Sequence, residues 1–120
     1  MHRRAARPVL ATLAVLWHTA ACAHAFPERE QPGVGAVVHQ APKQVSIEFD
    51  SRVEPAFSTL TIKDAGGKDI RVESHVDDAS QRTLEADVPP LAAGEYHVYW
   101  KVVSVDGHSS EGDYVFTIRP

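Results

Sequence analysis

Apolar and polar residues alternate with a period of two over several short runs, the pattern of β-strands with one buried face. The runs lie at 45–49, 57–62, 70–76, 83–88, 94–105 and 114–118, and a Gly-interrupted apolar stretch covers 33–38. Turn chemistry separates them, as at Asp64-Ala65-Gly66-Gly67 and at Pro89-Pro90, which cannot continue a central strand. After residue 23 no segment has a helical period over three turns. The pattern predicts an all-β, antiparallel β-sandwich or small barrel of about seven strands.

Residues 1–23 have the pattern of a cleaved secretory signal peptide rather than of a part of the fold. A basic start with Arg3, Arg4 and Arg7 precedes an apolar segment at 8–17. That segment is too short to span a bilayer, which needs about 20 residues. Ala21 and Ala23 then provide the small residues of a cleavage site. We therefore expect a mature domain of residues 24–120 that begins with His24.

Two other ways of processing this segment would change the mature terminus. Cleavage after Ala25, which also follows a small-x-small triplet, would discard His24. Lipidation of Cys22 would leave His24 as the third residue and without a free amine, although Thr19 stands where a lipoprotein signal usually has Leu. Cleavage after Ala23 agrees best with the pattern.

Composition excludes several classes of function. The whole chain has a formal net charge of −4, and loss of the three signal-peptide arginines makes the mature domain more acidic. Such a charge argues against nucleic acid as a partner, because phosphate binding needs clustered Lys and Arg. The single Met and the single Cys are Met1 and Cys22, so the domain has no sulfur ligand. Zinc fingers, iron–sulfur clusters and Met-rich Cu(I) sites are thereby excluded.

An N-terminal histidine is a bidentate metal ligand, because its free α-amine and its imidazole can bind one ion together. Asp106-Gly107-His108 offers a carboxylate and a second imidazole two residues apart. Amine, imidazole and carboxylate donors suit Cu(II) in a tetragonal arrangement. If the two ends of the chain meet, His24, Asp106 and His108 would form one copper site. The other histidines of the domain, His39, His75 and His97, are expected to be surface or hydrogen-bonded residues.

The chain resembles the CopC family of periplasmic copper-binding, copper-resistance proteins over nearly all of residues 24–119. The segments that carry the resemblance are the His24-Ala25 start, 35–38 with Ala41-Pro42, 45–49, 52–58, Tyr99–His108 with its WKVVSVDGH stretch, and 112–116. The resemblance implies a Greek-key β-sandwich of the immunoglobulin-like or cupredoxin-like kind. It also implies one Cu(II) per chain, bound by the His24 amine and imidazole, Asp106 and His108.

The chain departs from the family pattern at two points. Relatives with a second, Cu(I) site hold it in a methionine-rich loop, which this domain lacks. Many relatives also have Phe-Ser-Glu at a strand end, whose Glu supports the copper site, where this chain has Phe49-Asp50-Ser51. We therefore expect a single Cu(II) site, with the supporting carboxylate either missing or supplied by Asp50.

The resulting hypothesis is a periplasmic, monomeric protein that is not an enzyme and that sequesters or delivers Cu(II). The resemblance implies an inner-membrane copper transporter of the CopD type as its partner. One alternative is an oxidase or monooxygenase with a histidine brace, which also uses an N-terminal histidine. Asp106 argues against it, because an anionic ligand stabilises Cu(II) over the Cu(I) that oxygen activation needs. The other alternative is a secreted β-sandwich interaction domain with incidental histidines.

Overall fold

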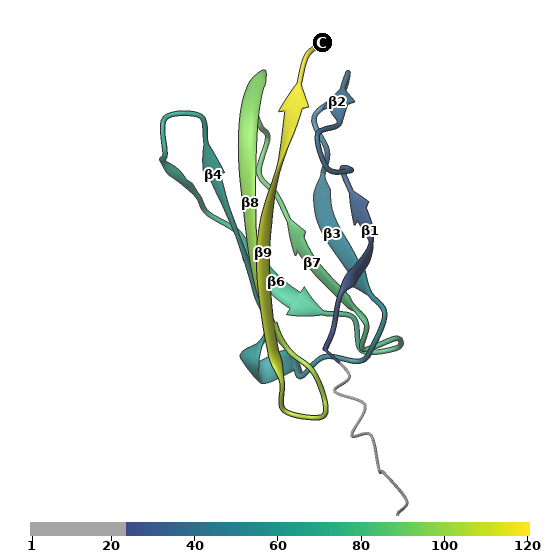
Figure 1. Cartoon of the computed structure of the whole chain (residues 1–120). Coiled ribbons are helices and arrows are strands. Elements are labelled where there is room, and N and C mark those ends of the chain that lie inside the picture. Colours follow the sequence, from purple (N-terminus) through teal and green to yellow (C-terminus); the bar gives the residue numbers. More distant parts are fainter. Residues whose placement is uncertain (1–23) are drawn as a thin grey trace, which may run out of the picture.

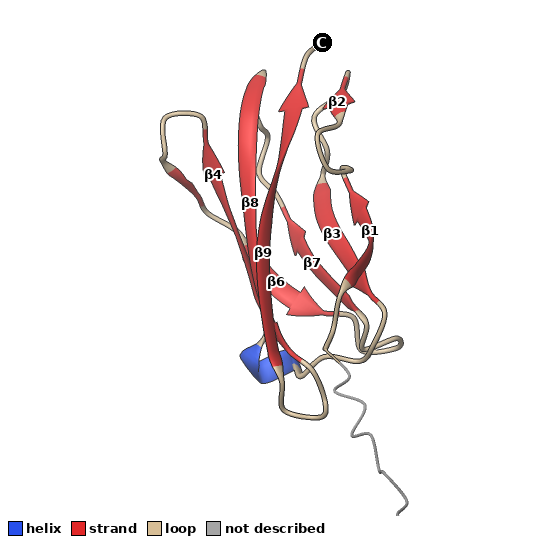
Figure 2. Cartoon of the chain, in the orientation of Figure 1, coloured by secondary structure: helices blue, strands red, loops and turns tan. Residues whose placement is uncertain are grey.

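The computed structural model describes residues 24–120 as two β-sheets packed face to face (Figure 1, Figure 2). The predicted signal peptide, residues 1–23, lies outside the described residues. The first sheet has the strand order β1-β3-β7-β6 and the second β2-β9-β8-β4-β5. The strands are β1 Pro27–Gln31, β2 Val37–Val38, β3 Gln44–Phe49, β4 Thr59–Asp64, β5 Asp69–Ile70, β6 Glu73–Val76, β7 Thr83–Asp87, β8 Gly94–Val103 and β9 Ser109–Ile118. A one-turn 3-10 helix, η1, covers Pro55–Phe57.

This architecture confirms the predicted all-β sandwich. Within residues 24–120 there are nine strands rather than about seven, because the run at 70–76 is divided between two strands and because β1 was not predicted. The sequence of β1, Pro-Glu-Arg-Glu-Gln, has no apolar alternation, since this edge strand has no fully buried residue. Every pair of strands is antiparallel except β2 and β9, which run parallel.

The core lies between the sheets, where the alternating residues of both meet. On β3 the inward residues Val45, Ile47 and Phe49 are fully buried, and β8 and β9 contribute residues such as Val98 and Phe116 from the opposite sheet. The Phe49 ring also meets the indole of Trp100 edge to face, with centroids 5.2 Å apart. Removing a ring of this kind typically costs about 3–5 kcal/mol of stability. The two sheets that carry the loops are thus stabilised by packing of the core, without a disulfide.

The longest ladder joins β8 to β9 over their full lengths, and their connecting turn, residues 104–108, lies at one end of the sandwich (Figure 1). The described part of the chain begins at the same end, just before β1 (Figure 1). β2 and the C-terminus lie at the opposite end. Among the described residues, no helix is long and apolar enough to cross a membrane. The fold therefore brings the first residues of the domain next to the Asp106-Gly107-His108 turn.

Candidate metal site

The turn between β8 and β9 is a tight loop whose shape depends on a glycine. The Ser104 amide donates to the His108 carbonyl at 2.8 Å, and the Gly107 amide donates to the Ser104 carbonyl at 2.9 Å. Gly107 has a φ of 92°, which residues with a side chain rarely adopt. The turn thus places Asp106 and His108 side by side on the outside of the loop.

Asp106 is held as a carboxylate by its own turn. Its Oδ1 accepts hydrogen bonds from the hydroxyl of buried Ser104 and from the His108 amide, the latter at 3.0 Å. The same oxygen lies 3.1 Å from Nδ1 of His108. These donors, the Ser104 hydroxyl first, lower the pKa of Asp106 from 3.8 to about 2. The carboxylate is therefore an anion throughout the neutral and mildly acidic range.

The N-terminal arm, residues 24–26, is held to the sandwich by the burial of Ala25 and by hydrogen bonds of the Phe26 amide and carbonyl. Ala25 is fully buried in the core. The Phe26 amide donates to Oδ1 of Asp50 at 2.8 Å, and the Asp50 amide donates to the Phe26 carbonyl at 2.9 Å. His24 is therefore one residue away from an anchored segment rather than at the end of a free tail.

The two predicted histidines meet. The rings of His24 and His108 have centroids 4.9 Å apart and are tilted by 54°. Within residues 24–120, no three His, Cys, Asp or Glu side chains already stand as ligands around one point. In the unprocessed chain the His24 nitrogen is also a peptide amide, since Ala23 precedes it. Cleavage of the signal would add the amine to a neighbourhood that already has two imidazoles and a carboxylate, a donor set that fits Cu(II).

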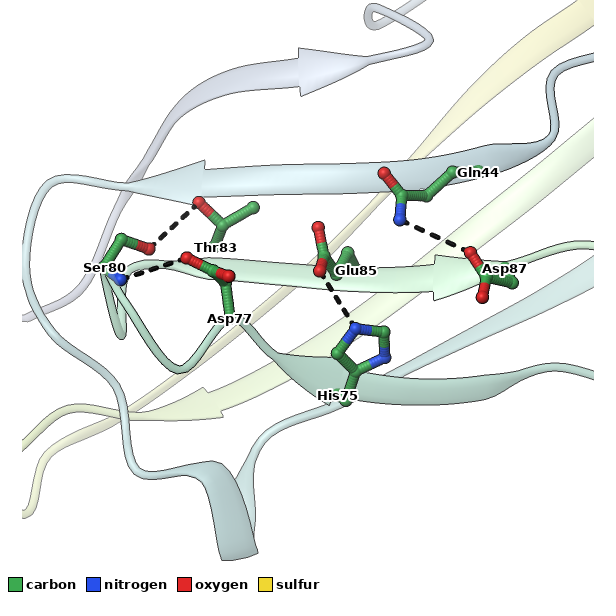
Figure 3. A network of polar contacts seen from close by, with 7 residues as sticks. All are labelled: Gln44, His75, Asp77, Ser80, Thr83, Glu85 and Asp87. Atoms are coloured by element: carbon green, nitrogen blue, oxygen red, sulfur yellow. Dashed lines mark hydrogen bonds and ion pairs between the residues drawn. The ribbon is translucent and has the colours of Figure 1, made fainter.

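The remaining histidines have partners elsewhere on the surface. His75 Nε2 lies 2.9 Å from Oε1 of Glu85 on the outer face of the first sheet, within the polar network of Figure 3. On the second sheet, His97 Nε2 lies 2.5 Å from Oδ2 of Asp113. His39 Nδ1 lies 2.8 Å from the Arg119 carbonyl oxygen. These contacts agree with the expectation that all three are hydrogen-bonded surface residues.

The structure adds one residue to the site and gives a contact for another. Ser104 was not predicted, although a serine two residues before Asp106 can donate its hydroxyl to that carboxylate. Asp50 was considered as a support for a copper ligand. In the structure its carboxylate accepts from the main chain of Phe26, so its contact is with the arm that carries His24.

Comparisons with known proteins agree with this fold. The family model of the CopC domain matches residues 28–119. Protein YobA of Escherichia coli (strain K12) is 33% identical over 101 residues, which are 81% of this chain and 80% of that protein. Copper transport protein CutJ of Bacillus subtilis is 30% identical over 99 residues, 80% of this chain but 18% of CutJ.

A solved structure agrees as well. The crystal structure of CopC from Methylosinus trichosporium OB3b superposes with a TM-score of 0.77 at 38% identity, covering 81% of this chain and 95% of that one. The family match spans most of the chain, and the fold is shared with that solved structure. This chain therefore belongs to the CopC family.

Proposed function

We propose that this protein is a periplasmic Cu(II)-binding protein for copper homeostasis and resistance. One ion per chain would bind to the α-amine and imidazole of His24, the Asp106 carboxylate and the His108 imidazole. Proteins of the CopC family are copper-binding resistance proteins, not enzymes. The observation that carries the site assignment is the contact between the rings of His24 and His108, which are far apart in the sequence, beside an ionised carboxylate.

The anchoring of the arm supports a mature chain that starts at His24. Cleavage after Ala25 would remove both the histidine and a side chain that is fully buried in the core. Cleavage after Ala23 keeps Ala25 in place and frees the amine next to the imidazole. An amine binds metal only after losing a proton, and its ordinary pKa of about 8 makes that loss easy at neutral pH.

Delivery of copper to a transporter agrees with the name of one relative, the copper transport protein CutJ. CutJ, a copper transport protein, contains a stretch similar to this chain within a much longer sequence. We propose that this protein acts as a monomer and hands Cu(II) to an inner-membrane transporter of the CopD type. Sequestration of copper until that encounter is part of the same function.

The test is a titration of the exported protein. Its intact mass and N-terminal sequence establish whether His24 is residue one. Cu(II) and Cu(I) are then titrated separately against competing chelators of known affinity. We expect one tightly bound Cu(II) and much weaker binding of Cu(I), because the donors are nitrogen and oxygen and the domain has no sulfur. Two tight copper ions per chain, or a preference for Cu(I), would contradict the single-site proposal.

A further inference from the structure

Three large hydrophobic side chains are exposed on segments at the end of the domain that holds the candidate site. Phe26, Phe57 and Val105 expose 58%, 66% and 51% of their surface. They belong to three different segments, namely the arm that carries His24, the helix η1 and the turn that carries Asp106 and His108. We call these three residues the apolar rim.

Backbone contacts join two of these segments, η1 and the β8–β9 turn. Val53 bridges to Ser104, and the Glu54 amide donates to the Val103 carbonyl at 2.7 Å, immediately before η1. The Val105 amide donates to the Arg52 carbonyl at 3.1 Å. Figure 1 shows η1, the β8–β9 turn and the start of β1 at one end of the molecule. The segments that carry the apolar rim and the site therefore lie at the same end of the domain.

The other exposed hydrophobic residues of the described chain do not form such a group. Val34 and Val37 lie in or just before β2, at the opposite end (Figure 1). Tyr99 is on the outer face of β8 and stacks on the ring of His97 at 4.3 Å. Among residues 24–120, three segments carry exposed large hydrophobic side chains at the end of the domain that holds the candidate site.

Packing within the domain does not explain Phe57. Phe57 is the most exposed of the large hydrophobic residues in the described part of the chain. Grouped, exposed apolar side chains mark interaction surfaces, and aromatic residues contribute most to such contacts. Phe57 thus has the features of a binding residue for another protein.

The occupant follows from how the domain occurs in its relatives. In CutJ the similar stretch is 18% of a copper transport protein, whereas the CopC of Methylosinus trichosporium is matched over 95% of its chain. A similar unit is thus a small part of a copper transport protein in one relative and nearly the whole crystallised chain in another. We propose that the apolar rim is the docking surface by which this protein binds its copper transporter, an inference that rests on the proposed function. Docking at this end brings the transporter's ligands within reach of the ion.

The experiment measures docking and copper binding separately on the mature protein. The probe is the CopD-type transporter of the same cell in lipid nanodiscs, with empty nanodiscs as the blank, and Cu(II)-loaded protein is titrated onto both. The variants are Phe57→Ser and Val105→Ser, with Val34→Ser as the matched control because that valine is 64% exposed at the far end. Cu(II) affinity and the thermal transition are measured for every variant.

We expect Phe57→Ser to weaken transporter binding at least about tenfold and Val105→Ser to weaken it less, with Val34→Ser unchanged. Cu(II) affinity stays at the wild-type value in Phe57→Ser and Val34→Ser. Equal transporter binding by all four proteins would overturn the docking surface. So would binding to empty nanodiscs, absence of binding by the wild type, or a wild-type dimer that Phe57→Ser abolishes. If the wild type itself did not bind Cu(II), the proposed function would be overturned instead.

Discussion

Two kinds of histidine–carboxylate pair occur in this protein, and they differ in what surrounds them. On the sheet faces, His75 meets Glu85 at 2.9 Å and His97 meets Asp113 at 2.5 Å. At the end of the sandwich, His108 lies 3.1 Å from Asp106. By distance alone, the pairs on the sheets are at least as close as the pair at the candidate site. Proximity of one imidazole and one carboxylate therefore does not distinguish a metal site.

The turn pair differs from the pairs on the sheets in having further donors nearby and in having a carboxylate that hydrogen bonds keep ionised and oriented. The turn pair has a second imidazole beside it, that of His24, and the proposed cleavage after Ala23 would add an amine. Its carboxylate is ionised and oriented by Ser104 and by the His108 amide. The pairs on the sheets are contacts between strands of a regular ladder. The proposed metal site needs ligands from distant parts of the chain. The segments that carry these ligands meet at the end of the sandwich where the β8–β9 turn lies.

The largest effect is expected from blocking the amine. A variant that keeps one extra residue before His24 should bind Cu(II) orders of magnitude more weakly, because the amine becomes an amide and the chelate is lost. The measurement is competition with a chelator of known Cu(II) affinity. The metal-free thermal transition should be unchanged, since Ala25 and Phe26 keep their anchoring contacts. Equal affinity of the native and extended termini would show that the amine is not a ligand.

Removing one histidine from each kind of pair compares the two regions directly. His108→Ala should weaken Cu(II) binding by more than about 100-fold, a larger loss than removal of a supporting residue typically causes. His75→Ala and His97→Ala should leave the affinity at the wild-type value. Calorimetric or competition titrations of the three variants provide the comparison. A loss in His75→Ala as large as in His108→Ala would mean that the site lies on the sheet face.

Copper should be released when its nitrogen donors take up protons, in a pH range where Asp106 is still ionised. Amines and imidazoles ordinarily titrate at pKa values of about 8 and 6.5, and Cu(II) must displace their protons. The pKa of Asp106 is lowered to about 2, so its carboxylate stays ionised through the release range. Asp106→Asn should move the release midpoint to higher pH, because Cu(II) loses an anionic ligand and protons then displace it more readily. The visible absorbance of bound Cu(II) follows its release. An unchanged midpoint would exclude the carboxylate as a ligand.

The same lowered pKa has a consequence for the metal-free protein. Any stability that Asp106 contributes is fully present above its ordinary pKa of 3.8 and is lost as the pH falls through about 2. In Ser104→Ala the largest cause of the lowered pKa is removed, so protonation of Asp106 should begin at higher pH. NMR titration of the carboxyl carbon would follow this change.

The smallest effect is expected from loosening the arm. Asp50→Ala removes the acceptor for the Phe26 amide and should weaken Cu(II) binding about tenfold, in the range of residues that orient ligands. Asp50→Asn keeps an oxygen acceptor and should retain most of the affinity. Competition titrations of both variants distinguish the two possible roles of Asp50. If Asn were as damaging as Ala, the charge of Asp50 rather than its hydrogen bond would support the site.

The strands that alternate cleanly could be predicted, and those that do not could not. The period of two at 45–49 and 83–88 reproduces β3 and β7, because each has one face in the core. The polar first half of β9, Ser109–Asp113, continues the ladder with β8 but contains no buried residue that would mark it. A strand that is stabilised by its neighbours' hydrogen bonds rather than by burial leaves no periodic signal.

The sequence by itself determined the kinds of donor, the lack of sulfur in the domain and the sandwich class, since these follow from residue types and local periodicity. It also identified His24, Asp106 and His108 as candidates. Only the tertiary structure decided that the His24 ring lies against His108, that Asp50 accepts a hydrogen bond from the arm, and that Phe57 stays exposed. These contacts join residues far apart in the chain, and the packing of two sheets, which no local pattern encodes, determines which segments meet.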